Sequence, residues 1–555
     1  MFHTYKNPVY EYKKSRDQNT SGPVHHPLVV VGAGPVGMAA AIDAAQQEIP
    51  TLILDEDNTV SVGSRAVCYS KRTLEIMNRL GCSQPMIERG VTWNLGKVFF
   101  RDQLVSSFNL LPEDGHKLPA FINLQQYYLE EYLVRRMDEF ENLEIRWKNR
   151  VMAVETNADR VVLSIDTPDG PYQLSCDWLL VADGANSPVR EFLGLESRGQ
   201  WFHDRFLIAD VVMKAEFPPE RWFSFDPSYH PGRSTLLHRQ PDDVWRLDFQ
   251  LGWDADPEME KKPENVIPRV RAMLGADIEF ELEWCSVYTF RCRRMETFRH
   301  GRVFFVGDAA HQVSPFGARG ANSGIQDTDN LIWKLKLVMT GKAPDRLLDS
   351  YSDERVYAAD ENIMNSTRAT DFITPKSAVS HTFRDAVLEL SCQQPFARDL
   401  INSGRLSDTA FLTESALTTP DSDRFGSDMV PGAAMLDAPV TGSQGSQWLI
   451  DLVGGRFTLL YFVDETATLS RSVLQDLEAL GANRIPVKSL VIGGHGEPAA
   501  GVATVIDTQG LFRKRYDATE GTTYLIRPDQ QVTARWRAFD ITKIVAAIDS
   551  ATANH

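Results

Sequence analysis

The segment GRVFFVGDAAHQVSPFGARGANSGIQDTDNLIWKL, residues 301–335, decides the fold of this chain. Its apolar run Val303–Val306 predicts a buried strand that ends at Gly307 and Asp308. A loop rich in Gly and Pro follows, and residues 321–340 show the periodicity of an amphipathic helix. A carboxylate would then lie at the mouth of a strand, beside the backbone N–H groups of a helix N-terminus. That combination suits a large ligand that carries hydroxyl groups and an electron-accepting ring.

A second segment, VVVGAGPVG at residues 29–37, has the features of a dinucleotide site. Leu28–Val31 predicts a buried parallel strand, and Gly32, Gly34 and Gly37 follow it with the GxGxxG spacing. The first glycine permits the tight turn, the second lets a pyrophosphate approach the backbone, and the third lets the helix pack closely. The Ala-rich helix predicted over 36–47 would point its positive end at the phosphates.

An acidic residue follows the next predicted strand. Thr51–Leu54 ends at Asp55, close to the offset expected for a carboxylate that binds a ribose 2′-OH, and Glu56 could serve instead. The ordered series of strand, glycines, helix, strand and acid predicts a dinucleotide site more strongly than the glycines alone.

A third segment lies between the first two. The apolar run Trp178–Val181 leads into Asp183 and Gly184, and Ser187 and Arg190 follow at helix-start spacing. The same pattern also occurs at ordinary joints between a strand and a helix, so it gains meaning only beside the other segments.

Together these segments resemble the flavoprotein aromatic hydroxylases, the single-component FAD monooxygenases of the p-hydroxybenzoate hydroxylase type. The resemblance spans roughly residues 27–370, and its most specific part is the GDAAH segment. Within the family, the sequence is most similar to the phenol hydroxylase and 3-(3-hydroxyphenyl)propionate hydroxylase branch. The resemblance implies an α/β fold: a Rossmann-like FAD-binding domain interleaved with a substrate domain that contains an antiparallel sheet, plus a thioredoxin-like C-terminal domain.

The motifs and the resemblance give one set of candidate FAD contacts. These are Gly32, Gly34, Gly37, Asp55, Glu56, Arg65, Gln126, Asp183, Gly184, Arg190, Gly307, Asp308, Gly317, Gly320, Ala321 and Asn322. The resemblance implies that Asp308 binds the ribityl chain, that Arg65 lies near the pyrophosphate, and that Gln126 contacts the flavin, with Gln125 as the alternative register.

Three residues are candidates for the catalytic centre: Pro315, Tyr288 and Arg319. The carbonyl of Pro315 is expected beside the reacting region, and backbone N–H groups from Gly317 onward can stabilise negative charge on a reduced flavin ring. The resemblance places Tyr288 in a pocket wall, although a buried structural tyrosine is an equal alternative. At Arg319 the family usually has Lys or Gln. His311 is more typical of a structural hydrogen-bonding residue than of a base.

Residues 203–290 predict a different kind of structure, a series of strands. In VWRLDFQL, Arg246, Asp248 and Gln250 share one face and apolar residues share the other. A twisted antiparallel sheet here could roof a substrate pocket, and a solvated polar face is the alternative.

The pattern along the chain predicts a domain order. We expect a polar N-terminal tail at 1–26, an FAD-binding domain at 27–200 and 290–370, a substrate-domain sheet at 201–289, a helical extension at 371–415, a linker at 416–446 and the thioredoxin-like domain at 447–555. No cysteine lies beyond Cys392, which excludes a dithiol role for the last domain and leaves a structural or dimer-forming role.

Composition limits the classes of partner. The chain has 555 residues, 43% of them hydrophobic, and a formal net charge of −17, which argues against nucleic acid and anionic membranes. No apolar run approaches the ~20 residues that span a bilayer. Six scattered cysteines in a sequence with no secretory signal indicate a cytoplasmic protein. Because the cysteines show no metal-like pairing, we expect no metal site.

The expected activity is hydroxylation of a phenolic compound, with a hydroxyaryl alkanoic acid among the candidate substrates. The resemblance implies non-covalent FAD, NADH or NADPH as electron donor, O2 as co-substrate and a flavin 4a-hydroperoxide as oxidant, because no side chain supplies electrophilic oxygen. A homodimer is left open. The alternatives are a related monooxygenase acting on a non-phenolic ring or an alkene, and a flavin-binding scaffold without turnover.

Overall fold

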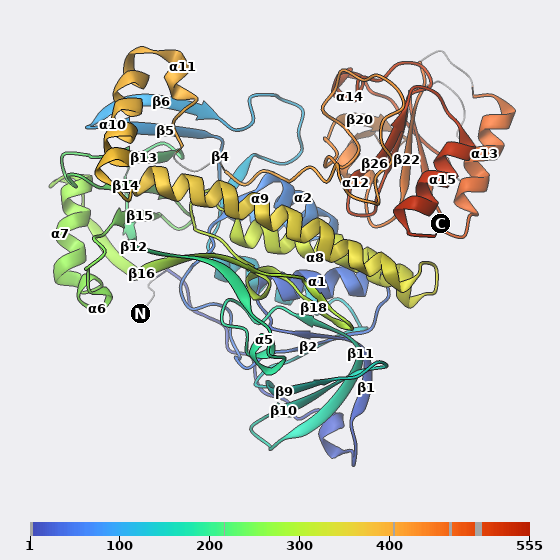
Figure 1. Cartoon of the computed structure of the whole chain (residues 1–555), viewed down its shortest axis with the longest axis horizontal. Coiled ribbons are helices and arrows are strands. Elements are labelled where there is room, and N and C mark those ends of the chain that lie inside the picture. Colours follow the sequence, from blue (N-terminus) through green and yellow to red (C-terminus); the bar gives the residue numbers. More distant parts are fainter. Residues whose placement is uncertain are drawn as a thin grey trace.

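The computed structural model describes residues 4–215, 217–402, 406–443, 445–464, 469–493 and 502–554. Figure 1 shows three parts: a central nucleotide-binding domain, a second large sheet at one end, and a C-terminal α/β domain at the other end. The predicted fold class is confirmed. The strands of the two large sheets alternate in groups along the chain, and a separate α/β domain follows. Within the described ranges, no helix is both long and apolar enough to cross a membrane.

The nucleotide-binding domain is built on a sheet with strand order β17-β18-β11-β1-β2-β8, which β10 and β9 extend from β11. Its strands are β1 (Val24–Val31), β2 (Thr51–Leu54), β8 (Leu143–Arg146), β9 (Arg150–Thr156), β10 (Val161–Asp166), β11 (Tyr172–Val181), β17 (Arg299–His300) and β18 (Val303–Phe305). The central pairs β18-β11, β11-β1, β1-β2 and β2-β8 are all parallel. Because central parallel strands are covered on both faces, each reads as a continuous apolar run.

Helices cover this sheet, and shorter elements connect its strands. They are η1 (Arg16–Asn19), α1 (Pro35–Gln46), β3 (Cys68–Ser70), α2 (Lys71–Leu80), α3 (Ser83–Arg89), β4 (Val91–Trp93), β7 (Phe121–Asn123), α4 (Gln126–Met137), α5 (Pro188–Phe192), η2 (Gly307–Ala309), β19 (His311–Gln312), α8 (Gly320–Met339) and η3 (Asp345–Leu348). Helices α1 and α8 pack closely: a Cβ placed on Gly324 would lie 2.7 Å from Val36 Cγ2 and 3.0 Å from Gly307 Cα. This close approach brings the glycine turn and the GD strand together.

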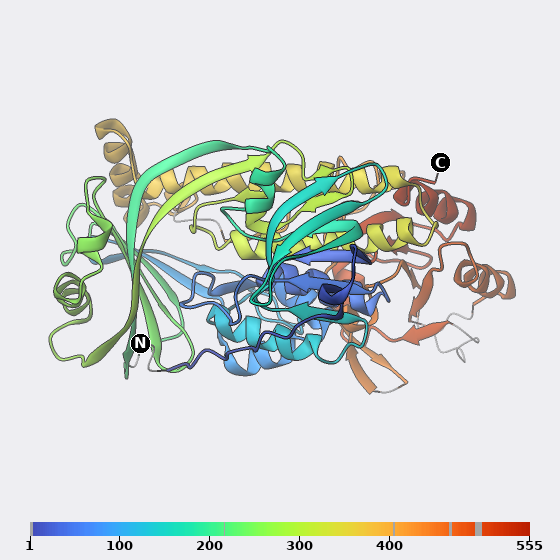
Figure 2. The same ribbon diagram turned by 90° about the horizontal axis from the view of Figure 1, so that it is seen from below.

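The second sheet has strand order β19-β16-β12-β15-β14-β13-β5-β6. Besides β19, its strands are β5 (Leu95–Phe100), β6 (Gln103–Asn109), β12 (Ser197–Met213), β13 (Arg221–Phe225), β14 (Ser234–Arg239), β15 (Val244–Gln250) and β16 (Phe280–Met295), and α6 (Pro257–Glu260) and α7 (Pro263–Leu274) lie beside it. Figure 2 shows the long strands β12 and β16 arching from the nucleotide-binding domain into this sheet. All neighbouring strands are antiparallel except β13 and β5, so the predicted sheet also recruits residues from 95–109.

The sheet has two differently packed faces. On the outer face Leu207, Leu247 and Phe249 pack in one apolar cluster with Val266 and Val270 of α7. On the inner face, Phe206 of β12, Phe223 and Phe225 of β13 and Phe290 of β16 belong to one cluster with Phe316 of the loop that precedes α8. Two long helices, α9 (Asp349–Ile373) and α10 (Ala378–Gln393), and the short α11 (Pro395–Arg398) complete this end of the molecule (Figure 1).

The C-terminal domain has a five-stranded sheet of order β24-β23-β22-β25-β26. Its elements are β20 (Pro439–Gly442), β21 (Gly445–Trp448), α12 (Leu449–Leu452), β22 (Thr458–Phe462), α13 (Arg471–Gly481), β23 (Lys488–Ile492), β24 (Ala503–Val505), α14 (Leu511–Arg515), β25 (Thr523–Ile526), β26 (Val532–Trp536) and α15 (Ile541–Ala551). β22 pairs in parallel with β23 and antiparallel with β25. This is the mixed topology expected of a thioredoxin-like domain.

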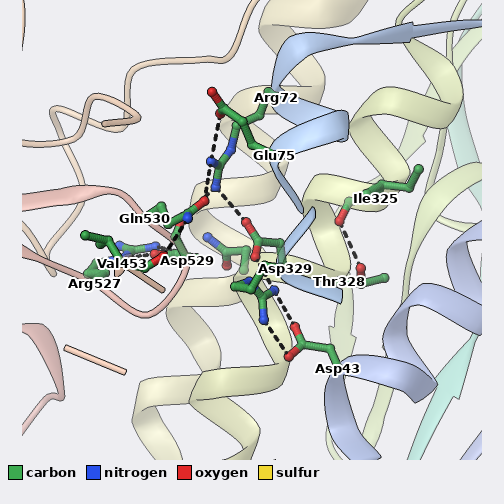
Figure 3. A network of polar contacts seen from close by, with 12 residues as sticks. Asp43, Arg72, Glu75, Ile325, Thr328, Asp329, Val453, Arg527, Asp529 and Gln530 are labelled. Atoms are coloured by element: carbon green, nitrogen blue, oxygen red, sulfur yellow. Dashed lines mark hydrogen bonds and ion pairs between the residues drawn. The ribbon is translucent and has the colours of Figure 1, made fainter. Parts of the chain in front are cut away.

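A buried network of charges attaches the C-terminal domain to the nucleotide-binding domain (Figure 3). Arg72 of α2 donates to Asp329 Oδ2 at 2.9 Å and to Gln530 Oε1 at 2.9 Å. Arg527 donates to both carboxylate oxygens of Glu354 on α9, at 2.6 and 3.0 Å. Burial would raise the pKa of Glu354, but Arg527 and Lys334 hold that pKa well below its usual value. The contact between the two domains is therefore stabilised by buried charges that are paired with charges of opposite sign.

Two segments that we expected to be loosely attached are packed on the protein. Tyr5 stacks on Tyr127 of α4 and Tyr10 on Trp147, so residues 4–22 run along the nucleotide-binding domain (Figure 2). Residues 416–438 have neither helix nor strand, yet Leu417, Met429 and other apolar side chains of this segment are buried against the C-terminal domain. In both segments, aromatic and apolar residues spaced among polar ones make the contacts.

Candidate functional site

The glycine turn after β1 has tight and open positions. A Cβ on Gly32, whose φ is +103°, would lie 2.4 Å from the Ala182 carbonyl oxygen, and one on Gly37 would lie 2.0 Å from the Gly32 carbonyl oxygen. At Gly34, in contrast, a Cβ would meet nothing within 4 Å. Backbone packing therefore requires two of the glycines, while the third keeps open space at the N-terminus of α1, where a pyrophosphate can approach.

The acid at the end of β2 is turned toward this glycine loop. Asp55 Oδ2 accepts a hydrogen bond from Ala33 N at 2.5 Å, and Oδ1 accepts one from Asp57 N at 2.8 Å. Burial raises the pKa of Asp55. Glu56 instead forms an exposed ion pair with Arg150, at 3.2 Å. Of the two candidates, Asp55 is the one that the structure brings to the nucleotide turn.

Asp308 lies in the most distinctive environment of the site. Surrounding protein atoms raise the pKa of its carboxyl group, yet the side chain keeps exposed surface and accepts no hydrogen bond from the described residues. A Cβ on Gly320 would lie 3.9 Å from Asp308 Oδ1, which places the carboxylate at the N-terminus of α8. The first intrahelical bond there runs from Ser323 N to Arg319 O, so the N–H groups of the preceding turn remain as donors.

The loop before α8 forms a tight turn. Ala318 N donates to Pro315 O at 3.1 Å, and Gly317 (φ +99°) and Ala318 (φ +53°) both adopt left-handed conformations. Phe316, which precedes them, packs on Phe206 and Phe290 of the second sheet, with ring centroids 5.0 and 5.3 Å apart. Pro315 is exposed. This turn holds the loop between the nucleotide-binding domain and the sheet that covers it.

Asn322 fixes the start of α8 to β3. Its Oδ1 accepts from Ser70 N at 2.9 Å, and its Nδ2 donates to the carbonyl oxygens of Cys68 and Ala318. The side chain is thereby fully used within the protein. Asn322 and the neighbouring Ala321 can contribute to a ligand through their backbone N–H groups.

The DGxxSxxR segment clamps two parts of the site together. Ser187 caps α5 by accepting from Arg190 N, and the buried Arg190 guanidinium donates to the carbonyl oxygens of Ala309 and Ala185. Arg190 therefore joins α5 to the GD motif rather than reaching outward. Burial raises the pKa of Asp183 to about 6, and its Oδ1 has no partner among the described residues. Gly184 has φ +82° and open space at its Cβ position.

Arg65 belongs to a loop near Asp308, and Gln126 is the first residue of α4. Arg65 is exposed, has no hydrogen bond to any described residue, and its charge acts to lower the pKa of both Asp308 and Tyr288, so it lies near both groups. Gln126 holds this loop by accepting from Ala66 N at 3.1 Å and donating to Ser61 Oγ at 2.9 Å.

Four further candidates have identifiable surroundings. The alternative glutamine, Gln125, is buried and donates to Pro241 O. Arg319 is buried and donates to Asn362 Oδ1 on α9. His311 is buried and hydrogen-bonds Asp327 Oδ2 at 2.7 Å, in keeping with a structural role. The Tyr288 hydroxyl has no partner among the described residues, although Arg65 lies near it.

The inner face of the second sheet carries polar residues that sequence reasoning did not assign to the site. They are Arg221 on β13, His238 on β14, Asp210 on β12 and Cys68 on the neighbouring β3. Arg246 and Asp248, whose orientation was left open, lie on the same face: Arg246 donates to both oxygens of Asp210, and Asp248 Oδ1 is buried without a partner in the described ranges. The alternation of residues in RWFSF and STLLHR is the sequence signal that could have placed Arg221 and His238 on this face.

Burial shifts the pKa values of this face. It raises the pKa of Asp248 to about 7, against the opposing effects of Arg246 and Arg221. It lowers the pKa of His238 well below the usual value, and both arginines lower it further. It raises the pKa of the Cys68 thiol to about 11. At neutral pH His238 and Cys68 are therefore uncharged, and Asp248 is near its midpoint.

The residues present fit FAD. Two helix N-termini, the open Cβ position at Gly34 and the unpaired Arg65 suit a pyrophosphate, and the unpaired carboxylate of Asp308 suits a chain of hydroxyl groups. In the described part of the chain, no group of three or more His, Cys, Asp or Glu residues is placed to hold a metal ion. Fold and site together define a flavin-dependent oxidoreductase.

Comparison with known proteins identifies the family. The FAD binding domain family matches residues 25–366, more than half of the chain, and the HcaD C-terminal domain family matches residues 432–551. The chain therefore belongs to the FAD-binding monooxygenases of the p-hydroxybenzoate hydroxylase type and is an FAD-dependent hydroxylase of aromatic substrates.

Individual relatives agree in length. The chain is 26% identical over 506 residues to a 3-(3-hydroxy-phenyl)propionate/3-hydroxycinnamic acid hydroxylase of Mycolicibacterium smegmatis, covering 91% of this chain and 89% of that protein. It is 27% identical over 519 residues to the enzyme of that name from Klebsiella pneumoniae subsp. pneumoniae, covering 91% of each. Its fold matches the crystal structure of the flavin-dependent monooxygenase PieE in complex with FAD and substrate with a TM-score of 0.79 at 20% identity, covering 96% and 99%.

Proposed function

We propose that the protein hydroxylates a phenolic compound, specifically a hydroxyaryl alkanoic acid, using non-covalent FAD, dioxygen and NADH or NADPH. Two similarities support the substrate class: the relatives named above act on hydroxyphenyl propionate and hydroxycinnamic acid, and they match over 91% of this chain. The observation that carries the proposal is that the second sheet closes over the loop between the GD motif and α8, where Phe316 packs on Phe206 and Phe290.

The nucleotide-binding domain would hold FAD at several points. Gly34 and the N–H groups of α1 would bind the pyrophosphate, Asp55 the adenosine ribose, and Asp308 the ribityl chain. The backbone N–H groups at Gly320, Ala321 and Asn322 would lie along the flavin ring and stabilise negative charge when the ring is reduced. Bound FAD, once reduced, supplies the electrophilic oxygen by reacting with dioxygen.

The second sheet would complete the reaction chamber. Phe316 with Phe206 and Phe290 gives an apolar wall that excludes water from the reacting atoms. Pro315 would present its carbonyl beside that wall, and Tyr288 would place its hydroxyl at the edge of the substrate ring.

NADH or NADPH as electron donor follows from the resemblance to the family. The sequence has no second GxGxxG unit, which fits a family whose members bind the nicotinamide without a separate domain. Asp183 and Gly184 belong to the motif that the resemblance links to both FAD and the nicotinamide cofactor. Arg65, exposed beside the site, is the cation available for a phosphate of that donor.

A steady-state assay tests the proposal. FAD-loaded protein is supplied with NADH or NADPH, and consumption is followed with and without hydroxybenzoates, hydroxyphenylacetates, hydroxyphenylpropionates and hydroxycinnamates. We expect one of these acids to stimulate consumption and to yield a product heavier by one oxygen atom, derived from labelled dioxygen. Stimulation without an oxygenated product, or no stimulation by any phenol, would contradict the proposed activity.

A further inference from the structure

A polar cavity lies where the C-terminal domain meets the nucleotide-binding domain. Its volume is about 610 Å³, within the range of about 300–1,000 Å³ that small-molecule sites occupy. None of the candidate FAD contacts lines it, so it is a space separate from the flavin site. One domain contributes Asn78, Arg79 and Lys117 to its walls, and the other contributes residues 450–454, Arg456 and Lys488.

The cations on the nucleotide-binding side of this cavity are compensated. Arg79 donates to both carboxylate oxygens of Asp43, at 2.9 and 2.8 Å, and to Asp329 at 2.6 Å. Lys117 Nζ donates to Asp451 Oδ1 of the C-terminal domain at 2.6 Å. Each cation on this side therefore has a carboxylate partner, and the second pair joins the two domains.

The cations on the C-terminal side are not compensated. Arg456 is exposed, and its side chain has no ion pair or hydrogen bond to any described residue. Lys488, partly buried at the start of β23, donates to the carbonyl oxygen of Leu452 at 2.6 Å and has no carboxylate partner in the described ranges. Burial lowers the pKa of Lys488, and the charge of Arg456 lowers it further, so the two cations are close together. Two neighbouring positive charges thus line the cavity in a chain whose net charge is −17.

The turn between α12 and β22 adds a backbone donor to the same wall. Gly454 has φ +121°, and a Cβ there would lie 2.9 Å from Arg79 Cδ, so a glycine lets this turn approach α2. The Gly454 N–H donates to no described residue. Gln530 holds the turn by donating to the carbonyl oxygen of Val453 at 2.8 Å (Figure 3). A free N–H in a turn beside two cations is typical of a site for an anion.

The closeness of the two cations favours a compact group with more than one negative charge. A phosphate group carries about −1.5 to −2 charges at pH 7 and has three acceptor oxygens, whereas a carboxylate carries one charge. We propose that this cavity binds a small phosphate compound, whose phosphate group contacts Arg456 and Lys488. The bound compound would touch both domains and so strengthen their attachment. This binding would be independent of the proposed hydroxylation.

The test uses the FAD-loaded protein and isothermal titration calorimetry at constant ionic strength. Each phosphate compound is compared with a carboxylate: inorganic phosphate with acetate, pyrophosphate with malonate, and glucose 6-phosphate with gluconate. We expect at least one phosphate compound to bind with a dissociation constant below about 1 mM and its carboxylate counterpart to bind at least about tenfold more weakly. Equal affinity for inorganic phosphate and glucose 6-phosphate would identify free phosphate as the ligand, and tighter binding of glucose 6-phosphate would identify an organic phosphate.

Variants locate the binding at the cavity. Lys488→Met should weaken the phosphate compound by about tenfold or more, and Arg456→Met, at an exposed position, by about three- to tenfold. The controls Lys543→Met on α15 and Arg471→Met on α13 remove exposed cations of the same domain that do not line the cavity, and they should leave the affinity unchanged.

The melting temperature separates binding from folding. The phosphate compound should raise the melting temperature of the wild-type protein, because it binds only the folded state, and it should not raise that of the double variant with both cavity cations replaced. Binding of no phosphate compound below about 1 mM, equally tight binding of the carboxylates, or equal weakening in the cavity and control variants would overturn the proposed site. Because no substrate or electron donor is present, these results do not depend on whether the protein hydroxylates a phenol.

Discussion

Replacing Asp308 with alanine should weaken FAD binding without weakening the protein itself. The carboxylate accepts no hydrogen bond from the described residues and the surrounding protein atoms raise its pKa, so the apoprotein gains little from it. In the complex it would accept charge-assisted hydrogen bonds from the ribityl hydroxyls, each worth about 1.5–3 kcal/mol. One lost bond therefore predicts a dissociation constant raised by about 10- to 150-fold.

The assay removes FAD and adds it back while the quenching of flavin fluorescence is followed. Asp353→Ala, at an exposed carboxylate on α9, provides the control and should bind FAD as the wild type does. The apoprotein of Asp308→Ala should melt at or above the temperature of the wild-type apoprotein. An unchanged dissociation constant, or a destabilised apoprotein with normal FAD affinity, would refute the assignment of Asp308 to the cofactor.

The remaining predictions concern other parts of the account. Gly34→Val should abolish retention of FAD measured after gel filtration, because its side chain fills the open space at the pyrophosphate position, while the circular dichroism spectrum stays that of the wild type. Affinity for an anionic substrate should fall as pH rises through about 7, since Asp248 on the inner face of the second sheet then becomes negative; titrations from pH 5.5 to 8.5 should show the fall, and Asp248→Asn should flatten it. Arg527→Met should lower the free energy of unfolding by about 3–5 kcal/mol in denaturant titrations because it removes one of the two buried cations, Arg527 and Lys334, that compensate the carboxylate of Glu354. Arg513→Met, which breaks an exposed pair, should cost less than about 1 kcal/mol.

The local geometry of the candidate cofactor residues could be predicted from the sequence, because short-range patterns specify it. Glycines at fixed spacing after an apolar strand can be read directly, and the structure places Gly32 and Gly37 where any side chain would clash with backbone. Gly307 and Asp308 follow β18 as expected. The choice between Asp55 and Glu56 could not be made from spacing, because adjacent side chains differ only in direction.

The substrate half was predicted less completely. Its sheet includes β5 and β6, which the sequence pattern assigned to the FAD-binding domain at 27–200, because strand partners far apart in the chain leave no local signal. The surroundings of Arg221 are set by strands that lie far apart in the chain. Alternation along RWFSF gives the face on which Arg221 lies but not what it contacts.

The role of the terminal segments also depended on long-range contacts. The N-terminal residues read as a polar tail, yet Tyr5 and Tyr10 anchor them on α4 and Trp147. The pair between Arg527 and Glu354 joins residues separated by 173 positions. No periodicity reports such a pair, and a buried ion pair can be recognised only when both partners have been located.

The central claim is that separated segments of this chain converge on one FAD, and its stoichiometry tests this most directly. Protein purified from rich medium, then incubated with FAD and freed of excess, is denatured, and the released flavin is identified and quantified against the chain. We predict a yellow protein that releases close to one equivalent of FAD and, by mass, carries no covalent flavin. A colourless protein that takes up no FAD, or one that binds a different flavin in its place, would contradict the account.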